Sequence, residues 1–202
     1  MIRWFLLVSL CLSTIHGGNT LPEHHVTPES AYEARRQAEA AAKQETLLSY
    51  MQVLKSIAES PPIYDEVSDS IAYAIAASIH IDSKLTGLPA TFYMGLLRVE
   101  NPQLEPYICN WYGACGLTQV VPRYWAGIFE ECGHDLEGDI YTQICYGARI
   151  YLHYHQVWDD EILALYAYNG CTKALRARKA RCVHYPRWVQ DYAQEYEETL
   201  YP

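Results

Sequence analysis

The sequence predicts a mainly α-helical protein, and three observations support this fold class. Apolar residues recur at helical spacing in several segments, and no segment has the alternating apolar and polar pattern of a half-buried strand. Half of the 202 residues are hydrophobic, which is ample for a core. A chain of this length without internal repeats is expected to form one domain with extensions.

The first expected helix begins at Thr27-Pro28-Glu29, where threonine is placed to cap the helix and proline fits its first turn. Its first half, residues 30–46, is rich in alanine and charged residues and lacks a broad apolar face. We expect this half to be a solvated extension or a docking arm for a partner. The second half, from Leu47 to Ile57, gains apolar residues and is expected to pack on the domain. Ser60-Pro61-Pro62 ends the element and serves as a linker.

Four further helices are expected downstream. The first of them ends near Gly87, where glycine permits a left-handed conformation. Pro102 ends the second by keeping Asn101 out of the helical region. A short helix is expected to open at Gly116–Gln119, together with a small irregular or β-hairpin excursion. The four expected helices span residues 67–87, 88–100, 139–155 and 161–169.

The amino-terminal residues have the pattern of a secretory signal peptide. Arg3 gives a positive charge before the short apolar stretch 4–12, and small and polar residues follow. The stretch is shorter than the roughly 20 apolar residues of a membrane span. We therefore expect a signal peptide at residues 1–18, a helical extension with linker at 19–62 and the main domain at 63–202. The mature protein is expected to be exported, with no stable membrane span.

The cysteine content fits an oxidising compartment. Removal of the signal peptide takes Cys11 and leaves six cysteines, an even number for which disulfides are the default. Six cysteines allow fifteen pairings, and loop closure favours neighbours only mildly. Zinc is a weaker alternative, because no C-x-x-C pair occurs and the histidines lie at unrelated spacings. The pairing of neighbours would join Cys109 with Cys115, Cys132 with Cys145, and Cys171 with Cys182.

The net charge of −9 makes nucleic acid an unexpected partner. A local exception is a basic cluster between Cys171 and Cys182. Such a cluster is usually a solvated face, and the alternative is contact with an anionic polymer or a membrane surface. The cluster consists of Lys173, Arg176, Arg178, Lys179 and Arg181.

Glu100 closes an almost wholly apolar run that begins at Leu88. The run is long enough for about three helical turns, so Glu100 is expected at the exposed end of a buried helix. A carboxyl group half sunk in apolar surroundings holds its proton more tightly, because its charged form loses solvation. Such a glutamate can serve as a general acid near neutral pH. The alternative is a solvated glutamate, or one paired with a neighbour such as Arg98.

Three short segments follow Glu100 in the sequence. Residues 113–122 read Gly-Ala-Cys-Gly-Leu-Thr-Gln-Val-Val-Pro, residues 147–152 read Gly-Ala-Arg-Ile-Tyr-Leu, and residues 167–170 read Ala-Tyr-Asn-Gly. Together with Glu100 and in this order, they resemble the soluble lytic transglycosylase (SLT) domain family. The resemblance covers roughly residues 67–192, and its specificity comes from the order and spacing of motifs that are individually weak.

The resemblance implies a lysozyme-like α fold, of the SLT and goose-type lysozyme kind, in residues 63–202. It also implies cleavage of the peptidoglycan glycan strand between N-acetylmuramic acid and N-acetylglucosamine. Glu100 is the implied acid, which gives its proton to the glycosidic oxygen. It then acts as a base on the C6 hydroxyl of the muramic acid, which leaves a 1,6-anhydro end. No cofactor and no metal are implied.

This chemistry needs one carboxyl group, because the acetamido group of the substrate supports the developing positive charge. Ordinary glycosidases use a second carboxylate about 5 to 9.5 Å away. The acidic residues that follow, Glu105, Glu130 and Glu131, fall in no motif. A hydrolytic N-acetylmuramidase is therefore the second hypothesis, and an inactive peptidoglycan-binding protein of the same fold is another. A cysteine peptidase fits poorly with an even set of exported cysteines.

The resemblance also implies which residues bind the substrate. Gln119 is expected to bind an acetamido group, Tyr168 to orient Glu100 or the scissile region, and Asn169 to support the cleft. Trp111 is one of four aromatic residues that flank the Gly-Leu-Thr-Gln segment at residues 116–119. These aromatic residues are expected either to stack on sugar rings or to pack in the core. The remaining expected binding residues are Gly116, Leu117 and Thr118, and the other aromatic residues are Tyr112, Tyr124 and Trp125.

Three positions depart from the common pattern of the family. Asn101 stands where many members have serine, Thr118 where many have methionine, and Gly170-Cys171 lacks a further small residue. Asparagine can still form local hydrogen bonds, and threonine is a modest change in packing. Small exported proteins with this domain resemble wall-opening enzymes of secretion, conjugation or pilus systems, and phages carry the domain too. The signal peptide favours the bacterial periplasm, with such an envelope-spanning assembly as partner.

Overall fold

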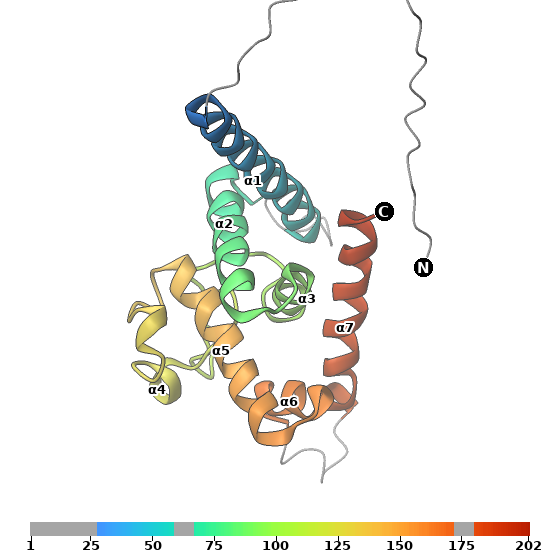
Figure 1. Cartoon of the computed structure of the whole chain (residues 1–202). Coiled ribbons are helices and arrows are strands. Elements are labelled where there is room, and N and C mark those ends of the chain that lie inside the picture. Colours follow the sequence, from blue (N-terminus) through green and yellow to red (C-terminus); the bar gives the residue numbers. More distant parts are fainter. Residues whose placement is uncertain (1–27, 59–66, 172–179) are drawn as a thin grey trace, which may run out of the picture. The chain divides into compact units, whose positions relative to one another are not determined.

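The computed structural model describes residues 28–58, 67–171 and 180–202 (Figure 1). These ranges are mainly helical, as predicted, and contain no β-strand. The expected signal peptide, the linker at Ser60-Pro61-Pro62 and four members of the basic cluster lie outside the described residues. The helices are α1 (Pro28–Ala58), α2 (Asp69–Thr86), α3 (Ala90–Glu100), α4 (Pro122–Trp125), α5 (Ile140–Trp158), α6 (Glu161–Tyr168) and α7 (Ala180–Leu200), with a 3-10 turn at Glu130–Cys132.

The chain divides into two units, Met1–Glu39 and Ala40–Pro202. In the first unit the described side chains, which belong to the beginning of α1, are exposed. In the second unit the remainder of α1 enters the core from Leu47 onward, and both Leu54 and Ile57 are buried. Leu48 is the exception, since it is half exposed. The expected change from a solvated to a packed half of this helix is therefore confirmed.

The helix ends follow local signals in the sequence. Ser68 caps α2 by accepting a hydrogen bond from the amide of Ile71, and Gly87 closes this helix in the left-handed conformation, with φ of 77°. Asp139 caps α5 by accepting from the amide of Thr142, and Asp160 caps α6 in the same way through the amide of Leu163. With these caps, the observed ends of α2, α5 and α6 lie within a few residues of the predicted ends.

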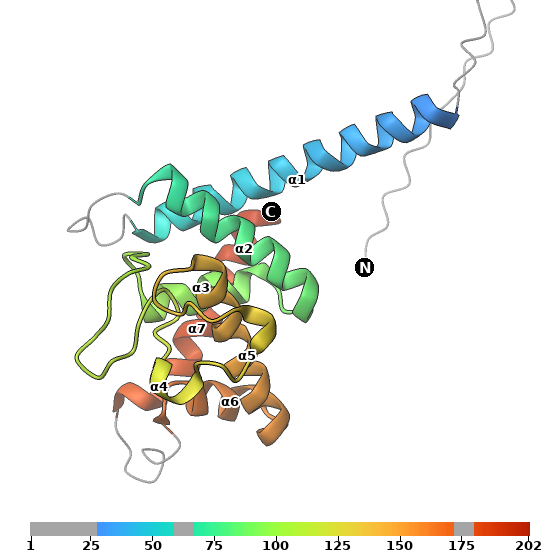
Figure 2. The same cartoon turned by 90° about the vertical axis from the view of Figure 1, so that its left-hand side faces the viewer.

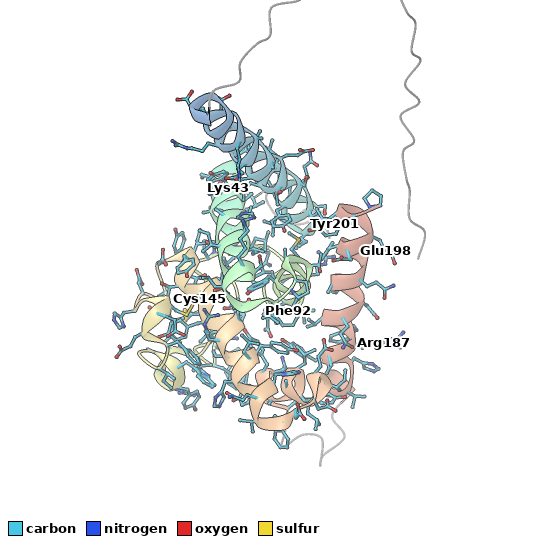
Figure 3. The ribbon with its side chains drawn as sticks, in the orientation of Figure 1. Lys43, Phe92, Cys145, Arg187, Glu198 and Tyr201 are labelled. Atoms are coloured by element: carbon cyan, nitrogen blue, oxygen red, sulfur yellow. A yellow bond between two sulfur atoms is a disulfide. The ribbon has the colours of Figure 1, made fainter. Side chains whose placement is uncertain are left out.

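The last helix, α7, contributes much of the core although the sequence analysis named no helix there. Tyr185, Val189 and Tyr196 are buried along one side of α7 and join the main hydrophobic cluster. The views in Figures 1 and 2 agree that α3 lies against α7. Phe92 of α3 is labelled in Figure 3. Its ring centroid lies 4.4 Å from that of Tyr151 in α5.

Gly95 sets the separation of α3 and α7. A Cβ atom at this position would lie 2.5 Å from the carbonyl oxygen of Val189 and 2.9 Å from the amide nitrogen of Ala193. Both are backbone atoms, so a side chain at position 95 requires the helices to move apart. The absence of a side chain at Gly95 thus permits this close approach of the two helices.

A buried polar network joins α2, α3 and α5. Tyr93 donates a hydrogen bond of 2.7 Å to the fully buried carboxyl group of Asp82, whose second oxygen lies 3.5 Å from the guanidinium of Arg149. Burial raises the pKa of Asp82, while the bond from Tyr93 and the charge of Arg149 oppose this shift. Arg149 belongs to the second of the three sequence motifs, which therefore has a structural role here.

Residues 101–139 are largely irregular. The expected β excursion consists of two isolated bridges, which join Cys115 to Cys109 and to Val120. The prediction that a short helix opens at Gly116 is wrong, because residues 116–119 form a turn. Gly116 and Gln119 have φ values of 72° and 49°, in the left-handed region that a right-handed helix cannot use.

The cysteines pair with their neighbours in the sequence, which confirms the pairing expected from their order. The disulfides are Cys109–Cys115, Cys132–Cys145 and Cys171–Cys182. Cys145 lies on the buried side of α5 and ties this helix to the irregular segment before it (Figure 3). Among the described helices, none has both the length and the apolar character needed to cross a membrane.

The substitution Gly95→Ala is expected to lower the free energy of unfolding by about 2 to 3 kcal/mol, because the added methyl group meets backbone of α7. For a chain of this size, this corresponds to a melting temperature lower by roughly 5 to 10 °C. Thermal and urea unfolding followed by circular dichroism measure the change. The control is Gly138→Ala, where the close atoms belong to the exposed side chain of Asp135. Equal stability of the two variants would contradict the proposed close contact.

Candidate active site

Glu100 is the last residue of α3, and its side chain is half-buried. The residues before it, from Ala90 to Leu97, are all buried. The helix stops because Asn101 leaves the helical region, with φ of −147°, while its amide still donates to the carbonyl of Leu97. The position at the solvent end of a buried helix is the one predicted from the apolar run and Pro102.

Tyr185 of α7, to which no sequence motif points, is a hydrogen-bond partner of Glu100. Its hydroxyl donates to Oε1 of Glu100, although the two residues are 85 positions apart. Burial raises the pKa of Tyr185 well above its usual value, and the nearby Glu100 charge raises it further. The phenol therefore keeps its proton and acts as a neutral donor. The helical spacing of Tyr185, Val189 and Tyr196 is a sequence signal that could have placed Tyr185 on a buried helix face, although not beside Glu100.

Two pockets meet at Glu100. The first, here named the α7 pocket, has a volume of about 280 Å³, and the second, the loop pocket, has a volume of about 120 Å³. The carboxyl group thus has space for a ligand on two sides. Besides Glu100, the α7 pocket is lined by Arg98, Val99, Asn169, Tyr185, Trp188 and Tyr192, and the loop pocket by Asn101, Gln103, Ile108, Cys109, Asn110 and Gln119.

Acidic residues are sparse in these walls. Among the described residues that line the two pockets, Glu100 is the acidic one. Glu131 is exposed and pairs with Arg149 at 3.1 Å. Glu105 lines a larger pocket of about 500 Å³, between the start of α2 and residues 103–108, whose lining does not include Glu100. The largest of these three pockets therefore does not include Glu100. The α7 pocket and the loop pocket, which do, define the candidate site.

Gln119 lies in the loop pocket with Glu100, as the resemblance implied. Its Nε2 donates to the carbonyl of Gly116 at 2.8 Å, and its Oε1 accepts from Nδ2 of Asn110 at 3.0 Å. Each of these groups has one further hydrogen-bonding position, since an amide nitrogen carries two hydrogens and an amide oxygen two lone pairs. The side chain is therefore held in place and can still bind a ligand.

Gly116, Leu117 and Thr118 are buried beneath this wall, so the side chains of Leu117 and Thr118 support the loop from inside. The buried amide of Gln143 holds this turn. Its Oε1 accepts from the backbone amide of Leu117 at 2.9 Å, and its Nε2 donates to the carbonyl of Pro106 at 2.7 Å. A Cβ atom at Gly116 would lie 2.5 Å from the Gln143 side chain, which explains the glycine. Gln143 belongs to none of the motifs recognised in the sequence.

Asn101 provides the second support of the loop. Its Nδ2 donates to the carbonyls of Glu105 and Gly116, at 2.8 and 3.1 Å, and its Oδ1 accepts from the amide of Glu105. The side chain is almost fully buried. Asn101 therefore forms the local hydrogen bonds expected of an asparagine at this position. Thr118 packs closely against Gly147 of α5. A Cβ atom at position 147 would lie only 2.6 Å from Cγ2 of Thr118.

Tyr168 was expected to orient Glu100 or the scissile region, but its hydroxyl donates to the carbonyl of Thr118 at 2.8 Å, whereas the hydroxyl of Tyr185 donates to Glu100. Burial raises the pKa of Tyr168, and the charge of Glu100 adds to the shift. Tyr168 thus connects α6 to the turn that carries Gln119. Asn169 ends α6 and lines the α7 pocket. Glu100 thus shares the loop pocket with Gln119 and the α7 pocket with Asn169, while Tyr168 supports the turn beside Gln119.

The four aromatic residues near this segment differ in burial. Trp111 is 83 % exposed, and Tyr112 and Tyr124 are each 62 % exposed. Trp125 is half-buried and packs against the rings of Phe129 and Tyr154. Core packing thus accounts for Trp125, whereas the other three rings face solvent. Trp111 is not among the described residues that line the loop pocket.

Comparisons of the chain with models of protein families, with curated proteins and with solved structures found no match.

The substitution Gln143→Leu is expected to lower the free energy of unfolding by about 2 to 5 kcal/mol, because it leaves the amide of Leu117 and the carbonyl of Pro106 buried without partners. Hydrogen exchange at Leu117 should accelerate, and urea unfolding gives the change in stability. The matched control is Gln194→Leu on the exposed face of α7, which should change neither quantity appreciably. Unchanged exchange at Leu117 in the Gln143 variant would contradict this account of the loop.

Proposed function

We propose that the protein is a peptidoglycan lytic transglycosylase with a lysozyme-like fold, in which Glu100 is both the acid and the base. The observation that carries the proposal is the position of Glu100, half-buried between two pockets and hydrogen-bonded to Tyr185. A bond that is to be cleaved inside a polymer needs space for sugars on both sides of the acid. The α7 pocket and the loop pocket supply this space.

In the proposed reaction, Glu100 protonates the glycosidic oxygen and the bond to C1 of the muramic acid breaks. The resulting carboxylate then takes the proton of the C6 hydroxyl as this oxygen attacks C1, so that the proton lost in the first step is regained. Tyr185 orients the carboxyl group throughout, because its hydroxyl remains a donor. Gln119 is placed to bind an acetamido group, for which an amide offers both a donor and an acceptor.

The single acidic residue among the described pocket walls favours this reaction over hydrolysis, in which a second carboxylate acts as the base or nucleophile. A hydrolytic N-acetylmuramidase is the second candidate function. The three disulfides favour an exported protein, and we propose the bacterial periplasm as its compartment. Local opening of the cell wall for a secretion, conjugation or pilus assembly is the biological role that fits this activity best.

The substitution Glu100→Gln is expected to abolish the release of soluble fragments from purified peptidoglycan sacculi, because it removes the proton but keeps the size of the side chain. Circular dichroism and melting temperature should match those of the original protein. Mass spectrometry of the fragments released by the original protein decides the reaction type. Anhydro ends identify a lytic transglycosylase, whereas reducing ends identify a hydrolase. No release by pure, oxidised and folded protein would favour an inactive binding protein.

The substitution Tyr185→Phe is expected to lower kcat by about 10- to 100-fold with a small change in KM, because one hydrogen bond to a charged carboxyl group contributes about 1.5 to 3 kcal/mol. Tyr185 is a positioning residue in this view, so the pH dependence of kcat should change as well. The control is Tyr196→Phe, which removes a hydroxyl from a buried tyrosine of the same helix. Equal kinetic effects of the two substitutions would show that Tyr185 contributes only to packing.

A further inference from the structure

The tip of the loop between α3 and α4 exposes aromatic rings. Trp111 is 83 % exposed and Tyr112 is 62 % exposed. Residues 106–122 contain no charged residue, although 19 % of the whole chain is charged. An exposed, aromatic and uncharged surface of this kind is typical of a binding site.

The tip is also held rigidly. The Cys109–Cys115 disulfide closes its base, and Asn110 organises its turn. Oδ1 of Asn110 accepts from the backbone amides of Tyr112 and Ala114, at 2.9 and 3.2 Å. The ring centroids of Trp111 and Tyr112 lie 3.4 Å apart. A rigid aromatic pair loses little conformational entropy when it binds a ligand.

The same asparagine connects the tip to the loop pocket. Its Nδ2 donates to Oε1 of Gln119, and both side chains line the pocket that contains Glu100. The wall of the loop pocket thus continues directly into the turn that carries Trp111. A ligand that fills the loop pocket and extends beyond it passes toward the aromatic tip.

We propose that Trp111 and Tyr112 form an outlying sugar-stacking subsite, which binds the glycan strand beyond the loop pocket and makes the protein prefer long strands to short oligomers. This inference rests on the proposed function. Sugar rings present flat faces of C–H groups that aromatic rings bind, and the N-acetylglucosamine units of the strand carry no charge that would require a basic residue. A membrane surface fits less well, because segments that bind anionic lipids combine aromatic residues with lysine and arginine.

The test uses the Glu100→Gln protein, which should bind the strand without cleaving it. Isothermal titration calorimetry measures binding of a disaccharide, a tetrasaccharide and an octasaccharide of alternating N-acetylglucosamine and N-acetylmuramic acid. Adding Trp111→Ala should weaken binding of the octasaccharide by about three- to tenfold, the range for loss of one aromatic contact. Binding of the disaccharide should change by less than about twofold. Trp111→Phe should retain most of the affinity for the octasaccharide.

The matched control is Trp158→Ala, which removes an exposed tryptophan at the end of α5 and should change binding of neither oligomer. Equal weakening for all lengths would overturn the inference, since Trp111 would then belong to the pocket itself. Unchanged binding of the octasaccharide by the Trp111→Ala protein would overturn it while leaving the proposed function intact. Binding of no oligomer by any variant would overturn both. Loss of binding to phosphatidylglycerol vesicles in the Trp111 variant, without loss of sugar binding, would assign the tip to a lipid surface.

Discussion

The packing of α3 against α7 is the contact on which the candidate site depends. Gly95 lets the two helix backbones approach closely, and both helices carry a residue of the site about one turn from this contact. Glu100 ends α3, while Tyr185 precedes Val189 on α7. The carboxyl group and the phenol therefore meet because of helix packing, and neither depends on a loop for its position. Sites supported by packed helices hold their geometry better than sites on loops.

The other wall of the site is a loop, and buried amides give it the rigidity that helix packing gives the acid. Buried backbone groups must find hydrogen-bond partners, and a turn with left-handed residues at Gly116 and Gln119 cannot pair all of them internally. Gln143 and Asn101 supply the missing partners from α5 and from the end of α3. A disulfide closes the base of the same loop. The loop is thus fixed from below by buried side chains, of which Asn101 also lines the loop pocket.

Local signals allowed much of this arrangement to be predicted from the sequence. The mainly helical fold, most helix bounds, the half-buried Glu100 and the pairing of neighbouring cysteines all follow from residues close together in the chain. Tyr185 could not be predicted in the same way, because one tyrosine among 18 becomes distinctive only when the fold brings it to Glu100. Trp111 and Trp125 show the same limit, since similar sequence surroundings leave one exposed and the other packed. The turn at Gly116 was mistaken for a helix because its partner Gln143 is remote in sequence.

A neutral donor beside Glu100 suits a residue that must alternate between acid and base. A lysine or arginine in the position of Tyr185 would favour the carboxylate strongly over the protonated acid, and so would oppose the first step of the proposed reaction. A tyrosine hydroxyl donates to a carboxylate oxygen and equally to the carbonyl oxygen of a protonated carboxyl group. Because burial and the nearby carboxyl group hold the proton on Tyr185, the same hydrogen bond persists in both states. The orientation of Glu100 is then preserved while its charge changes, which one residue needs if it is to complete both steps.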